Sequence, residues 1–219
     1  MKKYFKILRK CKLFDNISDE DLDKLLTCLN AKVVSFDKKY TVFAEGNSAR
    51  FIGIVLSGSV QVARNDYYGN RTILSNMEVS EVFGEAFACA EVESLPVTTI
   101  ANEPSEIMLI DSHRILHYCT NACGFHQQMI FNLMKLLATK NIMLHQKSEI
   151  TSKRTTREKL LSYLASQAQR AQSNSFLIPF DRQELADYLE VDRSGLSAEI
   201  GKLRKEGILE SEKNHFRLL

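Results

Sequence analysis

The 219-residue chain is 44% hydrophobic and 26% charged, with a formal net charge of +2. This is typical of a globular protein long enough for two modest domains, and it neither requires nor excludes a nucleic-acid partner. No apolar run approaches the ~18 residues of a membrane span, and lysines and arginines interrupt the N-terminus, so we expect no membrane insertion, no secretory signal and a cytoplasmic protein.

The first half of the chain changes from a helical to a strand-like pattern. Residues 18–29 carry leucines at helical spacing behind an acidic capping-type start, which predicts a short helix. Short runs rich in Val, Ile, Phe and Thr follow at 33–36, 40–43, 51–56, 59–62 and 71–74. The glycines between them, which suit positive backbone dihedrals, are Gly46, Gly58, Gly69 and Gly84. Because no helix separates the runs, they predict an antiparallel β-roll.

One long helix is predicted from Phe125 to about Ile150, a stretch without proline or glycine. Its apolar stripe, wider than a coiled-coil seam, consists of Met129, Ile130, Leu133, Met134, Leu136, Leu137, Ile142, Met143 and Leu144. Such a helix needs two surfaces to bury it. We expect these to be the β-roll and the same helix of a second subunit, with packing inside one chain as the alternative.

A polar stretch at residues 151–154 precedes Thr155 and Glu158, which have the spacing of a capping box. This predicts a new helix from about Thr156 and a hinge near Ser152. The helix should end in the turn-forming residues 172–175.

Residues 180–207 predict two short helices joined by a tight turn. Asp181 and Glu184 form a capping pattern for the first helix, and Asp192 can cap the second. The expected inner face of the second helix is Leu196, Ile200 and Leu203. Its expected outward residues are Arg193, Ser194, Ser197, Ala198 and Lys202. Helix-turn-helix geometry of this kind indicates DNA reading, although helix pairs with short turns also occur in proteins that never touch DNA.

Beyond this pair, the runs at 208–210 and 215–218 flank polar residues 211–214. They predict a hairpin wing. Residues 177–178 are a candidate third strand.

Several motifs together resemble one known family. They are 56–60 (Leu-Ser-Gly-Ser-Val), 82–85 (Val-Phe-Gly-Glu), the long helix, and 181–189 with 191–194. On these residues the sequence resembles the Crp/Fnr superfamily, regulators of the cyclic-AMP receptor protein type, over almost its whole length. The resemblance implies an α+β fold: an N-terminal antiparallel β-roll that senses an effector (a cyclic-nucleotide-binding-like jelly roll) at 1–124, a dimerisation helix at 125–151 and a C-terminal winged helix-turn-helix at 152–219.

The same resemblance implies partners and DNA-contacting residues. The partners are a second copy of the chain, a double-stranded DNA operator that is pseudo-palindromic, and RNA polymerase, with no membrane. Carried over position by position, Arg182 and Gln183 would touch phosphates, supported by Lys202, whereas Arg193, Ser194 and Ser197 would face bases. Ala198 departs from the pattern, because many members have Arg there.

The effector is not predicted to be cyclic AMP. In members that bind cyclic nucleotides, Gly-Glu opens a cassette whose Arg neutralises the phosphate about eleven residues later. Here Gly84 and Glu85 are present, but residues 93–97 contain no Arg. We therefore expect a different small effector, not identified, and read Glu85 as a surface or ribose-type acid. The expected pocket is Gly84, Glu85, Ala86, Phe87, Leu95, Pro96, Val97 and Thr98, with Asn141, Leu144 and His145 from the long helix.

A thiol-redox or metal-responsive regulator on the same fold is the alternative. Cys119 and Cys123, and likewise His113 and His117, are four residues apart and would share a helical face. Cys11 and Cys28 do not resemble an iron-sulfur cluster motif, and five scattered cysteines, an odd number, argue against a disulfide framework. No supported arrangement of catalytic residues is found, so an enzyme is not predicted.

Overall fold

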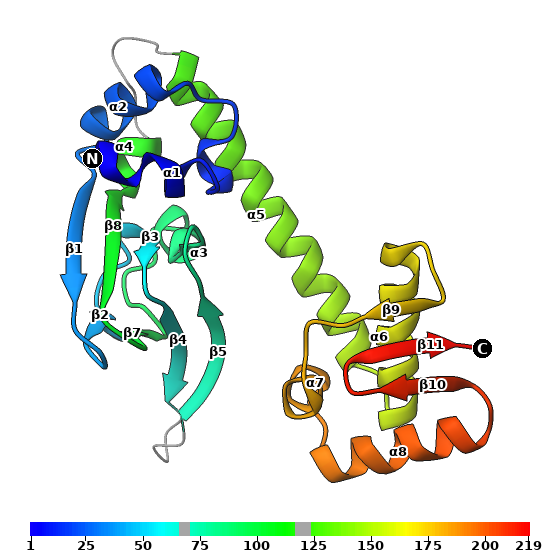
Figure 1. The fold of residues 1–219 in the computed structure, drawn as a ribbon. Coiled ribbons are helices and arrows are strands. Elements are labelled where there is room, and N and C mark those ends of the chain that lie inside the picture. Colours follow the sequence, from blue (N-terminus) through cyan, green and yellow to red (C-terminus); the bar gives the residue numbers. More distant parts are fainter. Residues whose placement is uncertain (66–70, 117–123) are drawn as a thin grey trace. The chain divides into compact units, whose positions relative to one another are not determined.

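The computed structural model describes residues 1–65, 71–116 and 124–219. The chain forms two compact units, Met1–Thr139 and Lys140–Leu219. Their boundary falls inside the long helix α5 (Gly124–Thr151; Figure 1). The helix predicted at residues 125–150 is therefore confirmed. Within the described ranges, no helix has the length and apolar character needed to span a membrane.

The described strands of the first unit form two four-stranded sheets with antiparallel pairing. One sheet has the order β1-β8-β3-β6 and the other β2-β7-β4-β5. The strands are β1 (Lys32–Phe36), β2 (Thr41–Phe43), β3 (Phe51–Ser57), β4 (Val60–Asn65), β5 (Arg71–Met77), β6 (Val82–Phe83), β7 (Thr98–Ala101) and β8 (Ser105–Asp111). Each of the five predicted runs falls on a strand, and the predicted β-roll is confirmed.

The first unit also contains short helices. They are η1 (Lys2–Tyr4), α1 (Phe5–Leu8), η2 (Lys12–Phe14), α2 (Asp19–Cys28), α3 (Glu85–Cys89) and α4 (Ser112–Leu116). The predicted N-terminal helix is α2, and its cap is Ser18, whose hydroxyl oxygen accepts from the Asp21 amide at 3.2 Å. The elements before Ser18 were not predicted, because three- or four-residue helices are too short to show a 3.6-residue period.

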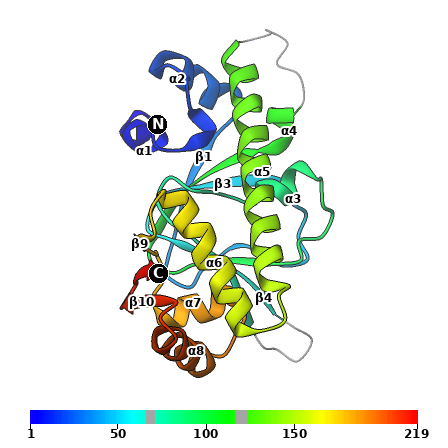
Figure 2. The same ribbon diagram turned by 90° about the vertical axis from the view of Figure 1, so that its right-hand side faces the viewer.

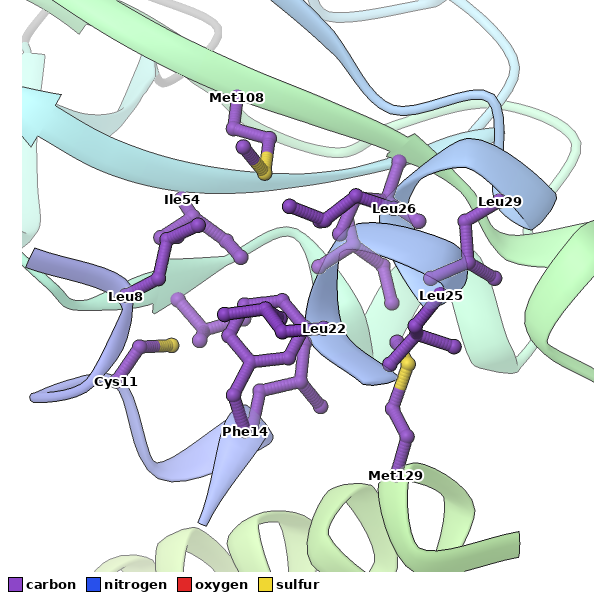
Figure 3. Packing of buried hydrophobic residues seen from close by; sticks show 14 of the residues in the cluster. Leu8, Cys11, Phe14, Leu22, Leu25, Leu26, Leu29, Ile54, Met108 and Met129 are labelled. Carbon is purple, nitrogen blue, oxygen red and sulfur yellow. The ribbon is translucent and has the colours of Figure 1, made fainter. Parts of the chain in front are cut away.

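The core of the first unit lies where α2 packs against the sheet and α5. Leucines of α2 point toward Ile54 of β3, Met108 of β8 and Met129 of α5 (Figure 3). Two polar contacts fix the start of α5: His126 shares a 3.0 Å hydrogen bond with the Ile115 carbonyl, and the Asn132 amide donates to the Leu13 carbonyl at 3.1 Å.

Three of the four glycines singled out in the sequence have the expected left-handed conformation. These are Gly46, Gly58 and Gly84, whose φ values are +86°, +74° and +77°. The fourth, Gly69, lies outside the described residues.

The second unit is a helix-turn-helix with a small sheet. Its elements are α6 (Thr156–Ala171), β9 (Ser175–Leu177), α7 (Arg182–Leu189), α8 (Arg193–Lys205), β10 (Leu209–Glu212) and β11 (His215–Leu218). The sheet order β10-β11-β9 confirms the hairpin wing and its third strand. Thr155 and Glu158 form the predicted capping box at the start of α6. The core is built on buried side chains from all three helices and the wing, including Leu164, Leu185, Leu196 and Phe216.

Candidate nucleic-acid interface

The helix pair α7 and α8 is fixed by local hydrogen bonds at both starts. The Asp181 carboxylate accepts from the Glu184 amide at 2.8 Å, and the Glu184 carboxylate accepts from the Asp181 amide at 2.7 Å. These reciprocal bonds satisfy two amides that have no partner inside the helix. The chain leaves α7 through Glu190, whose φ is +54°, and the fully buried Ala186 leaves room for α8 to approach. Figure 1 and Figure 2 show the two helices side by side.

The orientation of α8 follows from its sequence. Leu196, Ile200 and Leu203 are buried in the core of the second unit, as predicted. The opposite side of the helix is exposed to solvent. All the residues predicted to face outward are exposed, namely Arg193, Ser194, Ser197, Ala198 and Lys202. The helix therefore presents its polar side for contact with another molecule.

Asp192 caps α8, because its carboxylate accepts from the Gly195 amide at 2.9 Å. The same carboxylate oxygen also accepts the hydroxyl of Ser194. These two hydrogen bonds, that from Ser194 first, lower the pKa of Asp192. The N-terminus of α8 thus carries an ionised carboxylate beside the residues expected to face bases.

Arg182 and Gln183 are already engaged within the second unit. The guanidinium of Arg182 donates to the Lys213 carbonyl at 3.2 Å and lies 5.5 Å from the centre of the Phe216 ring. Arg182 is half-buried, and this desolvation lowers its pKa. Gln183 is exposed, and its side-chain amide donates to the Asp187 carboxylate at 2.8 Å. Arg182 therefore braces the wing against α7, a role that the sequence pattern does not show.

A second brace joins α6 to α8. Arg157 forms ion pairs with Glu206 at 2.6 Å and Glu199 at 3.5 Å, and these partners, Glu206 first, raise the pKa of Arg157. Lys202 lies 3.5 Å from the other Glu199 oxygen, but its side chain is 67% exposed. Because the Lys202 end of the pair is open to solvent, the pair contributes little to stability, and Lys202 is accessible to a phosphate.

In the first unit, Gly84 opens the segment predicted to hold an effector. A Cβ atom at Gly84 would lie 3.0 Å from the Phe43 ring and 3.2 Å from the Phe51 carbonyl oxygen, so both its φ and its surroundings favour glycine. Glu85 follows as the first residue of α3 and is only 4% exposed. Of the two readings given for Glu85, the surface acid is wrong because the residue is buried, and the ribose-type acid stays a prediction.

The remaining pocket residues differ in exposure. Leu95 and Val97 are buried, Phe87 and Thr98 are half-buried, and Ala86 and Pro96 are exposed. The backbone of Leu95 bonds on both sides of one loop, donating to the Asn47 carbonyl at 2.8 Å and accepting from the Gly46 amide at 2.9 Å. Asn141, Leu144 and His145 belong to the second unit and are exposed on α5.

The sequence around this segment holds no lysine or arginine between Arg71 and Arg114. Over the same span it carries glutamates at positions 78, 81, 85, 91, 93, 103 and 106. The segment itself therefore offers no cation to a bound phosphate.

The residues of the redox or metal alternative are only partly described. Cys119, Cys123 and His117 lie outside the described residues. Cys11 is buried, Cys28 is exposed, and half-burial raises the pKa of the Cys89 thiol. His113 lies 3.8 Å from the Glu91 carboxylate. Within the described ranges, no group of three or more His, Cys, Asp or Glu side chains is arranged to hold a metal ion.

Comparisons with known proteins agree with this architecture. The cyclic nucleotide-binding domain family matches residues 33–121, and the Crp-like helix-turn-helix domain family matches residues 158–219. The transcriptional activator protein FnrA of Stutzerimonas stutzeri is 24% identical over 187 residues, which cover 83% of this chain and 74% of that protein.

Two solved structures share the fold. The c-di-GMP-responsive global regulator CLP of Xanthomonas campestris has a TM-score of 0.61 at 16% identity, covering 91% of this chain and 99% of that one. DNR from Pseudomonas aeruginosa has a TM-score of 0.52 at 22% identity, covering 100% and 95%. A cyclic nucleotide-binding domain is followed in this chain by a Crp-like helix-turn-helix domain. The chain therefore belongs to the Crp/Fnr family of DNA-binding transcription regulators, which are not enzymes.

Proposed function

We propose that the chain acts as a homodimer that reads a pseudo-palindromic DNA operator through α8 and responds to a small effector other than cyclic AMP. The observation that carries the proposal is the exposed polar face of α8, held in place by caps at Asp181 and Asp192. Residues near the start of such a helix meet base edges in the major groove, and its cations meet phosphates. Arg193, Ser194 and Ser197 are assigned to bases, and Lys202, Gln183 and Arg182 to phosphates.

The second surface of α5 supports the homodimer. Met129 and Leu133 pack into the core of the first unit. Phe131, Met134 and Ile142 are 56%, 59% and 58% exposed. With Ala138 they recur at spacings of three, four and four residues, so they share one face of the helix, away from Met129 and Leu133. We call this face the α5 stripe; a second copy of the same helix can cover it by coiled-coil packing.

A two-fold dimer would place its two α8 helices in successive major grooves, roughly 34 Å apart, and so require inverted half-sites. As a transcription regulator, the DNA-bound dimer would act on RNA polymerase.

The effector assignment rests on charge. A phosphate that leaves water without a cation carries an uncompensated cost of several kcal/mol, and the segment after Gly84 supplies no such cation. The Xanthomonas regulator of this fold responds to c-di-GMP, which supports the view that the fold serves effectors other than cyclic AMP. In the proposed mechanism, effector binding to the first unit changes the populations of two conformations of the dimer. These conformations differ in the arrangement of the two helix-turn-helix domains, and residues near Ser152 act as the hinge.

Selection from a random DNA pool by the full-length protein tests the reading function. We expect enrichment of two inverted half-sites whose centres are about one helical turn apart. A single half-site would contradict the dimer, and no enrichment would contradict sequence-specific reading. Calorimetry with cyclic AMP tests the effector assignment, and micromolar binding would overturn it.

A further inference from the structure

The hydroxyl of Ser194 is tied to the cap of its own helix. Ser194 Oγ lies within hydrogen-bonding distance of Asp192 Oδ2, the oxygen that also accepts from the Gly195 amide. An ionised carboxylate has no proton to give, so the hydroxyl must be the donor. The lowered pKa of Asp192, caused first by the bond from Ser194, keeps the carboxylate ionised at neutral pH.

Ser194 also has a favourable position for contact with DNA. Ser194, Ala198, Gly201 and Lys205 recur at spacings of four, three and four residues, so they share one face of α8, away from the buried leucines. A Cβ atom at Gly201 would have no neighbour within 4 Å, and Ala198 is exposed. Small side chains in the middle of this face let the helix approach a groove closely. Ser194 is the polar side chain nearest the start of this face.

We propose that Ser194 reads DNA purely as a hydrogen-bond acceptor and selects the exocyclic amino group of adenine or cytosine. This inference rests on the proposed reading function of α8. A serine hydroxyl ordinarily donates and accepts, and so tolerates any base edge. With its proton committed to Asp192, Ser194 offers only lone pairs. In the major groove, adenine and cytosine present an amino donor, whereas thymine and guanine present acceptors at the matching positions.

The hydrogen bond to Asp192 also strengthens this preference. A hydrogen bond to an ionised carboxylate is about twice as strong as a neutral one, so a thymine or guanine oxygen cannot easily compete for the proton. A hydroxyl that donates to an anion becomes a better acceptor through polarisation. The charge of Asp192 itself disfavours a base oxygen placed nearby.

Base analogues in the selected operator test the inference, because every base pair presents one amino group in the major groove and the strand that carries it is not known in advance. Each position of a half-site is replaced by an analogue of adenine or cytosine without the amino group, or of thymine or guanine without the carbonyl oxygen. The affinity of the full-length protein should fall roughly two- to tenfold at one position when the amino group is removed. Ser194→Ala should bind more weakly to the natural operator and lose this sensitivity.

The acceptor role of Ser194 and the reading of DNA by α8 can fail separately. Sensitivity of the natural protein to the carbonyl oxygen at the Ser194-dependent position would overturn the acceptor assignment. A Ser194→Ala profile identical to that of the natural protein would also overturn it, while selection that still depends on Arg193 would leave the proposed function standing. Asp192→Asn keeps a capping oxygen but removes the charge. It should reduce the amino-group preference to less than twofold, and an unchanged preference would contradict the assignment of the proton.

Discussion

Replacing Gly58 by alanine should destabilise the first unit more than the same substitution at the other glycine turns that the structure describes. Gly58 lies between β3 and β4 with φ +74°. A Cβ atom there would overlap Ser105 Oγ and lie 2.6 Å from the Pro104 carbonyl oxygen, which is backbone and cannot move aside. A left-handed conformation costs a non-glycine residue about 1–3 kcal/mol. Overpacking adds about 1–3 kcal/mol, so we expect a loss of about 2–6 kcal/mol.

Gly46→Ala is the matched control. Gly46 has φ +86°, but a Cβ atom there meets nothing within 4 Å, so the substitution adds backbone strain without a clash. We expect a loss of about 1–2 kcal/mol. Urea unfolding of the full chain, read by hydrogen exchange of the β3 and β8 amides, measures both values. If Gly58→Ala and Gly46→Ala were equally destabilising, the packing of this turn against Pro104 and Ser105 would be wrong.

Three further predictions concern the dimer, the reading head and the thiol. Met134→Glu should dissociate the homodimer in sedimentation equilibrium, because it places like charges in the α5 stripe. Met143→Glu should not, because Met143 is similarly exposed but lies off the face that Phe131, Met134, Ala138 and Ile142 share, although the sequence pattern counted it among the apolar positions of the helix. Dissociation by both variants or by neither would contradict the α5 stripe. Asp181→Ala should lower the free energy of unfolding of the second unit by about 1 kcal/mol, or its Tm by about 4–8 °C. Asp181→Ser should keep most of this stability, because serine can also cap a helix. Equal Tm values for the two variants would refute the capping role. Burial raises the pKa of the Cys89 thiol, so this thiol should be alkylated slowly at pH 7 and faster only above the ordinary cysteine pKa of about 8.5. Alkylation is followed by peptide mass spectrometry. Rapid labelling at pH 7 would contradict this prediction and favour a redox role.

Features that depend on neighbours in the sequence could be predicted. The capping boxes at Asp181 and Thr155 involve residues three positions apart, so the sequence contains both partners. The antiparallel strands and the wing follow from alternating runs and turn residues in the same way.

Features that depend on contacts across the fold could not. Arg157 is 42 residues from Glu199 and 49 from Glu206, and no pattern joins them. The burial of Glu85 at the start of α3 is a second such feature, because a carboxyl group is ordinarily expected at the surface. The link between Ser194 and Asp192 is local, but a capping signature shows only which amide is satisfied and not where a neighbouring hydroxyl donates its proton.

The most direct test of the account is the effect of Arg193→Ala on binding to the selected operator. Arg170→Ala is the control, because it removes the same charge from the last turn of α6, at the end of the second unit away from α8 (Figure 1). We expect Arg193→Ala to weaken binding and to relax the base preference at one position of each half-site by ~1–3 kcal/mol. Arg170→Ala should retain both affinity and preference. Unchanged affinity and base preference in Arg193→Ala would contradict the placement of α8 as the reading helix.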